Sequence, residues 1–128
     1  MHRKAKGLNA ERSIVSKFWD CGWAAVRVAG SGASRFPNPD VLAAKIGRKL
    51  AIECKTTKSI KKYFLEEEIK QLKDFSQKFG AEPWIAIKFN SMPWYFVSLE
   101  DLEKTEKGFM VSITLAKMKG LLFEELIV

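Results

Sequence analysis

Two short apolar runs joined by a tight turn constrain the fold of this chain more than any other feature. Residues 41–46 and 49–55 have the length and the apolar content of β-strands, and Gly47-Arg48 between them suits a two-residue turn. Strands joined in this way run antiparallel, so the start of the first lies beside the end of the second. The sequence therefore predicts a β-hairpin whose open end brings residues near 40 and 55 together.

Polar side chains occupy that open end. Asp40 precedes the first run, and Glu53 and Lys55 end the second. Because side chains alternate between the two faces of a strand, Glu53 and Lys55 project together, opposite Leu50 and Ile52. We expect the three polar groups to converge on one spot. The alternative is that they are ordinary charges on a solvated sheet face.

Composition indicates a single domain over residues 1–128 and an anionic partner. The net charge is +7 and the pI is near 9.5, which favours a partner such as nucleic acid. No apolar run reaches the roughly 20 residues that span a bilayer, so we expect a cytoplasmic, nucleoid-associated protein without a membrane partner. With His2 as the only histidine and Cys21 and Cys54 as the only cysteines, histidine-based triads, zinc sites and disulfide frameworks are excluded.

Hydrophobic periodicity gives the order helix, three strands, helix, two strands, short helix. This order predicts the α/β class, with a central mixed sheet flanked by helices. The segments are a basic arm over 1–7, helices from about 8 to 21 and from 65 to 79, strands at 23–28, 41–46, 49–55, 84–89 and 94–97, a flexible loop at 30–39, a polar connection at 56–62, a capping box at Ser98 and Asp101 that opens a short helix, a helical pattern at 114–119, and an apolar end at 121–128 that fits a strand, a helix or an interface.

Glu11 is a fourth candidate for the polar cluster. It lies at helical spacing with Ile14, Val15 and Phe18, on the apolar stripe of the first predicted helix. A carboxylate in that position is costly unless it is paired or lies near a metal. The alternative is a first-turn glutamate that the helix dipole stabilises.

Carboxylate oxygens of this kind suit Mg²⁺, with Mn²⁺ as a substitute, and not zinc. Such a metal lowers the pKa of a bound water and offsets the charge that builds up on a phosphorus centre during hydrolysis. Lys55 beside it could position the water or stabilise the developing charge. Positioning and electrostatics supply most of phosphoryl-transfer catalysis, so the chemistry needs no nucleophilic side chain.

These residues resemble a known nuclease signature. Pro39-Asp40 followed by Glu53-Cys54-Lys55 is similar to the PD-(D/E)xK motif, whose core is restriction-endonuclease-like. A longer string resembles the archaeal Holliday-junction resolvases of the Hjc type over roughly residues 3 to 97, and the segment 98–128 matches poorly. The matching segments are Lys6-Gly7, Ala10-Glu11-Arg12, Val26-Arg27-Val28-Ala29-Gly30-Ser31, Asp40-Val41-Leu42-Ala43, Ile52-Glu53-Cys54-Lys55, Phe75-Ser76, Phe79-Gly80 and Ile85-Ala86-Ile87-Lys88-Phe89.

The resemblance implies a homodimeric, Mg²⁺-dependent endonuclease that cuts four-way DNA junctions in recombination and repair. By the family's pattern Glu11, Asp40, Glu53 and Lys55 carry the active site. The metal ligands implied are Asp40 and Glu53 with the backbone carbonyl of Cys54, and Glu11 is counted with them.

The same resemblance assigns residues to DNA and to the dimer. Phosphate contact or support of the site falls on Arg12, Arg27 and Lys88, and a loop serine, Ser31 or Ser34, lies near the scissile phosphate in the family. Phe75 and Phe79 match aromatic residues near the dimer surface. The further basic residues expected to line a phosphate-binding face are Arg3, Lys4, Lys6, Arg35, Lys58, Lys61 and Lys62.

Several alternatives stay open. The same core also serves nucleases that act on flap, duplex or single-stranded DNA. A catalytically inactive DNA-binding module and a basic ribosome-associated protein are two others, and the lysines could serve solubility alone. Recombination or clamp proteins are possible partners. Nothing in the sequence suggests an element that reads bases, so recognition would follow junction structure.

Overall fold

The computed structural model describes residues 3–30 and 35–128. Within these residues a five-stranded sheet has the order β1-β2-β3-β5-β6. Its strands are β1 (Ala24–Arg27), β2 (Val41–Lys45), β3 (Arg48–Thr57), β5 (Glu82–Phe89) and β6 (Trp94–Ser98). The pair β3–β5 is parallel and the other pairs are antiparallel, so the predicted mixed sheet is confirmed.

The predicted hairpin of β2 and β3 is confirmed, but its turn is Ile46-Gly47 and not Gly47-Arg48, because Lys45 pairs with Arg48. Gly47 forms its turn with φ of 87°, a conformation that a residue with a side chain rarely adopts, and the register pairs Val41 with Ile52. Strand β3 continues to Thr57, whereas β2 begins only at Val41. One edge of β3 therefore has no strand partner after Ile52 among residues 3–30 and 35–128, and this free edge positions the site described below.

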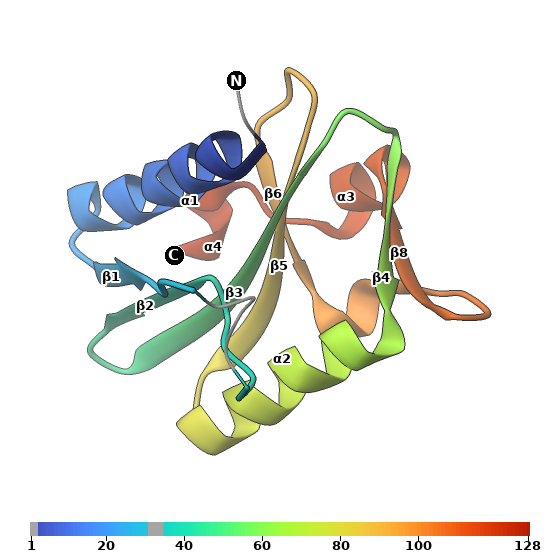
Figure 1. The fold of residues 1–128 in the computed structure, drawn as a ribbon. Coiled ribbons are helices and arrows are strands. Elements are labelled where there is room, and N and C mark those ends of the chain that lie inside the picture. The colour runs from blue at the N-terminus through green and yellow to red at the C-terminus, as the bar shows by residue number, and fades with distance from the viewer. Residues whose placement is uncertain (1–2, 31–34) are drawn as a thin grey trace.

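The helices lie on opposite faces of the sheet (Figure 1), and an apolar layer fills the space on each face. On one face, α1 (Arg3–Asp20) and α4 (Phe123–Leu126) pack through fully buried side chains such as Phe18 and Leu126. On the other face lie α2 (Glu66–Phe79), α3 (Ile113–Lys119) and a second sheet. Helix α2 ends at Gly80, whose φ of 77° closes it in the left-handed conformation.

The second sheet corrects the predicted order of elements. It consists of β4 (Lys61–Leu65), β8 (Gly108–Ser112) and β7 (Glu103–Lys104), in the order β4-β8-β7. The prediction of a polar connection over 56–62 is therefore wrong at both ends, because β3 runs to Thr57 and β4 starts at Lys61. Pairing with β8 turns a lysine-rich segment into a strand, and tertiary pairing of this kind overrides a weak local preference.

The predicted basic arm over 1–7 is wrong from Arg3 onward, because α1 begins there and not at Leu8. Lysine and alanine are good helix formers, and they extend the helix through Gly7 and Asn9. Residues 1–2 lie outside the described part of the chain. Across residues 3–30 and 35–128, no helix is long and apolar enough to cross a membrane.

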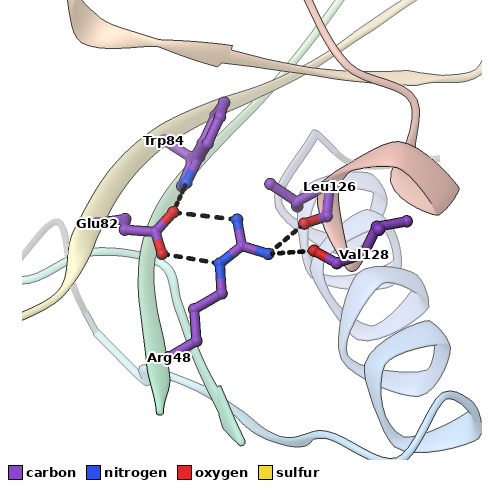
Figure 2. A network of polar contacts seen from close by, with 5 residues as sticks. All are labelled: Arg48, Glu82, Trp84, Leu126 and Val128. Atoms are coloured by element: carbon purple, nitrogen blue, oxygen red, sulfur yellow. Dashed lines mark hydrogen bonds and ion pairs between the residues drawn. The ribbon is translucent and has the colours of Figure 1, made fainter.

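The C-terminal segment is part of the core. After β6 come a 3₁₀ turn (Leu99–Asp101), strands β7 and β8 of the second sheet, and α3, and Leu121 then forms a β-bridge with Phe96. Figure 2 shows the polar contact that fixes the end of the chain: the Arg48 guanidinium donates to the carbonyls of Leu126 and Val128. The apolar end over 121–128 is therefore a bridge followed by the short helix α4.

Candidate active site

Asp40 is tied to β3 by both its backbone and its side chain. Its N–H donates to the carbonyl of Ile52 at 3.0 Å, and its Oδ2 accepts a hydrogen bond from the Cys54 N–H at 2.8 Å. Its carbonyl accepts from the Val28 N–H at 2.8 Å, so the residue lies between the ends of β1 and β3. The side chain is buried. This carboxylate is therefore held rigidly at the free edge of β3.

Glu53 and Lys55 extend from the same face of β3, as the alternation of side chains predicts. The Lys55 Nζ lies 3.7 Å from Glu53 Oε2, and the two side chains are 29% and 25% exposed. Burial and the neighbouring charge of Asp40 raise the pKa of Glu53 from 4.5 to about 8, and Lys55 offsets only part of that rise. Lys55 thus does not compensate for the burial and the Asp40 charge that act on Glu53.

Glu11 reaches the same place from α1, on the other side of the free edge. Burial and the charge of Asp40 raise the pKa of its carboxyl, while Arg27 and Lys55 act in the opposite direction. Glu11 is half-buried, as expected for a residue on the apolar stripe of the helix. It does not lie in the first turn, because α1 begins at Arg3. The helix-dipole alternative is therefore excluded.

A cavity of about 500 Å³ gathers these groups. All four side chains expected to carry catalysis line it. Its lining is Glu11, Arg35, Phe36, Pro37, Asn38, Asp40, Glu53, Cys54, Lys55, Glu68, Gln71 and Leu72. The convergence that the hairpin geometry predicts is thus present, and it extends to helix α2.

Sequence reasoning missed the residues that α2 and the preceding loop contribute. Glu68 lies with its Oε2 3.7 Å from the Lys55 Nζ, and Gln71 and Asn38 also line the cavity. By sequence Glu68 is one of three acidic residues in the first turn of α2, where the helix dipole favours negative charge. The signal that could have identified it is spacing, because Glu68, Gln71 and Leu72 share one side of α2.

The donor set suits a hard divalent cation. In residues 3–30 and 35–128, no three histidine, cysteine, aspartate or glutamate side chains are gathered tightly enough to enclose a metal by themselves. The N–H and C=O of one strand residue point to the same side, so the Cys54 carbonyl faces the Asp40 side of β3, as its N–H does. Two carboxylates plus this carbonyl are oxygen ligands, and a cation would offset both the burial of the Glu53 charge and its repulsion by Asp40, which together raise the pKa of Glu53.

The basic residues expected to bind DNA are spread over several surfaces. Arg35 lines the cavity and stacks on Phe36, with its guanidinium carbon 5.1 Å from the ring centroid. Arg27 ends β1 close enough to influence Glu11. Lys88 lies elsewhere, donating to the Met92 carbonyl at 2.8 Å beside a separate cavity of about 350 Å³.

The remaining basic residues surround these positions or fall outside the description. Exposed positions on α1 and in the β3–β4 region hold Arg12, Lys58 and Lys61, with Lys62 half-buried. The first turns of α1 contain Arg3, Lys4 and Lys6. Both candidate serines, Ser31 and Ser34, lie outside the described residues.

Phe75 and Phe79 form an apolar patch near the cavity. Their rings stack with centroids 5.2 Å apart, and Phe79 is 45% exposed. With Phe36 and Pro37 they line a further cavity of about 390 Å³.

A mixed sheet with a carboxylate-rich cavity at the free edge of its central hairpin defines the class of restriction-endonuclease-like nucleases. Comparison with known proteins agrees with this class. The model of the family "Archaeal holliday junction resolvase (hjc)" matches residues 2–128. This chain belongs to that family.

Individual relatives are similar over most of their length. The crossover junction endodeoxyribonuclease Hjc of Archaeoglobus fulgidus is 39% identical over 129 residues, which cover 95% of each chain. The Hjc protein of Sulfolobus acidocaldarius is 33% identical over 129 residues, covering 99% of this chain and 90% of the relative. The solved structure of Archaeoglobus fulgidus Hjc, a Holliday junction resolvase, superposes with a TM-score of 0.89 at 38% identity, over 95% of this chain and 100% of that one.

Proposed function

We propose that this chain is a structure-selective, metal-dependent endodeoxyribonuclease that resolves four-way DNA junctions. The observation that carries the proposal is the convergence of Glu11, Asp40, Glu53 and Lys55 on one cavity. Membership of the archaeal resolvase family supports it, as do relatives that are named crossover junction endodeoxyribonucleases.

Asp40, Glu53 and the Cys54 carbonyl would hold the metal, with Glu11 as a further ligand on the α1 side. Mg²⁺ is the cation proposed, with Mn²⁺ as a substitute, because both prefer oxygen ligands. When bound, such a cation acidifies a water and stabilises negative charge on the phosphate.

The chain's own residues supply position and charge. Asp40 is fixed by its hydrogen bond from Cys54, so its carboxylate needs little reorganisation. The Lys55 ammonium lies at the border of the cavity, where it can orient a water or balance the charge that develops on a phosphate oxygen. Arg35 lies at the same cavity and can contact a flanking phosphate.

A homodimer suits a two-fold symmetric junction, because resolution needs two cuts in opposed strands and a C₂ dimer repeats one site at a matched position. The aromatic patch of the partly buried Phe75 and the exposed Phe79 supports this face as the dimer contact. The net charge of +7 supports binding to the phosphate backbone in a salt-dependent way. With DNA as substrate, we place the protein in the cytoplasm with the nucleoid.

Cleavage of a four-way junction with a mobile core tests the proposal. Each strand is labelled in turn, and a linear duplex of the same sequence serves as the matched substrate, with Mg²⁺ or with a chelator. We expect paired nicks in opposed strands that require Mg²⁺. Equal cutting of the linear duplex would instead assign the chain to nucleases of other DNA structures, and cutting in chelator would refute the metal requirement.

A further inference from the structure

Glu68 contacts the active-site lysine from an element that the proposed mechanism does not use. It lies in the first turn of α2, and its side chain is 39% exposed at the cavity wall. Its Oε2 is 3.7 Å from the Lys55 Nζ, and its Oε1 accepts a hydrogen bond from the Leu65 N–H at 3.4 Å. One carboxylate thus bridges the start of a helix and the end of β3.

The Lys55 ammonium lies at the same distance from two carboxylates, 3.7 Å from Glu53 Oε2 and 3.7 Å from Glu68 Oε2. A lysine head group is a point charge on a flexible stem, so a single ion pair leaves it several positions. A second carboxylate within ion-pair distance reduces the number of these positions. Glu53 also has to supply a metal ligand in the proposed mechanism, whereas Glu68 can remain on the lysine.

We propose that Glu68 is a positioning residue that holds the Lys55 ammonium at the wall of the cavity. This inference rests on the proposed function. Helix α2 follows directly from β4, so the position of Glu68 depends on where the second sheet places the start of the helix. Glu68 is therefore one link between the second sheet and the active site.

The alternative is that the Glu68 side chain only caps the N-terminus of α2, which requires a hydrogen-bond acceptor but no charge. An oxygen acceptor at the third helical position satisfies the Leu65 N–H, and glutamine provides it as well as glutamate. Holding an ammonium requires the negative charge. The substitution Glu68→Gln therefore separates the two roles, because it keeps the acceptor and removes the charge.

Glu67→Gln is the matched control. Glu67 precedes Glu68 in the same first turn, is exposed, and its Oε1 accepts from Gln71 Nε2 at 3.4 Å. Both substitutions remove one carboxylate from the helix N-terminus, so their effects through the helix dipole are alike. Only Glu68→Gln removes a charge from Lys55.

Three measurements on each variant test the positioning role of Glu68: the unfolding midpoint, junction binding in chelator, and the rate of single-turnover cleavage with Mg²⁺ and saturating enzyme. We expect Glu68→Gln to slow cleavage about tenfold while binding changes by less than about twofold. Glu67→Gln should stay within about twofold of the original rate. Equal rates for the two variants, or a loss in Glu68→Gln that only follows weaker binding or unfolding, would overturn the proposal.

A readout that does not depend on activity is the NMR signal of Lys55 Cε in protein labelled with ¹³C at the lysine ε-carbon, assigned with Lys55→Met. Glu68→Gln should shift this signal and Glu67→Gln should leave it in place. An unmoved signal in Glu68→Gln refutes the contact, and a moved signal without slower cleavage refutes its catalytic consequence. If the unaltered protein cuts no junction, the proposed function fails, while the signal still tests the contact separately.

Discussion

Replacing Glu53 with glutamine should stabilise the metal-free protein while abolishing cleavage. The side chain is partly buried beside Asp40, and in the folded chain its pKa is about 8 instead of 4.5. Each pH unit between these values corresponds to about 1.4 kcal/mol, so ionisation of Glu53 disfavours the folded state by at most about 5 kcal/mol. Because a quarter of the side chain is exposed, solvent reduces this figure, and we expect about 2 to 4 kcal/mol.

The sign follows from proton binding. Between pH 4.5 and 8 the folded state keeps a proton on Glu53 that the unfolded state has released. The contribution of Glu53 to stability therefore falls as pH rises through this window and is constant above it. Glutamine has no charge to bury, so the variant lacks this decline.

The assay is urea denaturation in chelator at a series of pH values from 4.5 to 9. The free energy of unfolding of Glu53→Gln minus that of the unaltered protein should be small near pH 4.5 and reach about 2 to 4 kcal/mol near pH 9. Glu106→Gln, which alters an exposed glutamate in the β7–β8 turn, should show no such trend. A difference that does not change with pH, or a variant that is less stable at pH 9, would refute the electrostatic account of the cavity.

Three further predictions concern the site and the core. Asp40→Asn should remove cleavage and change junction binding by no more than a few fold, because the amide oxygen can still accept the hydrogen bond from the Cys54 N–H but ligates a cation poorly. Gel-shift and cleavage assays measure the two effects, and lost binding with intact cleavage would contradict the prediction. Arg48→Met should lower the free energy of unfolding by about 2 kcal/mol and speed up amide hydrogen exchange in residues 121–128, because it removes the hydrogen bonds to Glu82 and to the Leu126 carbonyl. Unchanged exchange rates would show that Arg48 does not anchor this segment. Phe18→Ala should lower the free energy of unfolding by about 3 to 5 kcal/mol in a denaturation experiment, because the fully buried ring packs on Phe123 with centroids 5.0 Å apart. A decrease below about 1 kcal/mol would mean that the side chains around Phe18 repack to fill the cavity.

The central part of the fold and the core of the site could be predicted from sequence because their signals are local. Alternation and a glycine turn define the β2–β3 hairpin, and the hairpin by itself brings Asp40 to Glu53. Glu11 could be found because a carboxylate on an apolar stripe conflicts with its surroundings. Each of these inferences depends on a few neighbouring residues.

The second sheet could not be predicted in this way, because it exists through pairing between distant segments. Strand β4 carries lysines at 61 and 62 and exposes Tyr63, so its local pattern resembles a loop. In β8, Gly108 resembles a turn residue, yet a Cβ there would lie 2.1 Å from the Phe64 carbonyl oxygen, so the glycine permits a close approach of two strands. The role of Glu68 could not be predicted either, because Lys55 is distant in sequence and comes close to Glu68 only when β4 positions the start of α2.

The register of the β2–β3 hairpin has a consequence for how this protein tolerates change. The turn at Ile46-Gly47 is exposed and far along the strands from the cavity, and loops of this kind usually accept insertions and deletions. Here a single-residue deletion that slipped the pairing by one place would swap the faces of β3, burying the acidic end under α1 and turning apolar side chains toward the cavity. A deletion of this kind in the Ile46-Gly47 turn would remove activity as completely as the substitution of an active-site carboxylate.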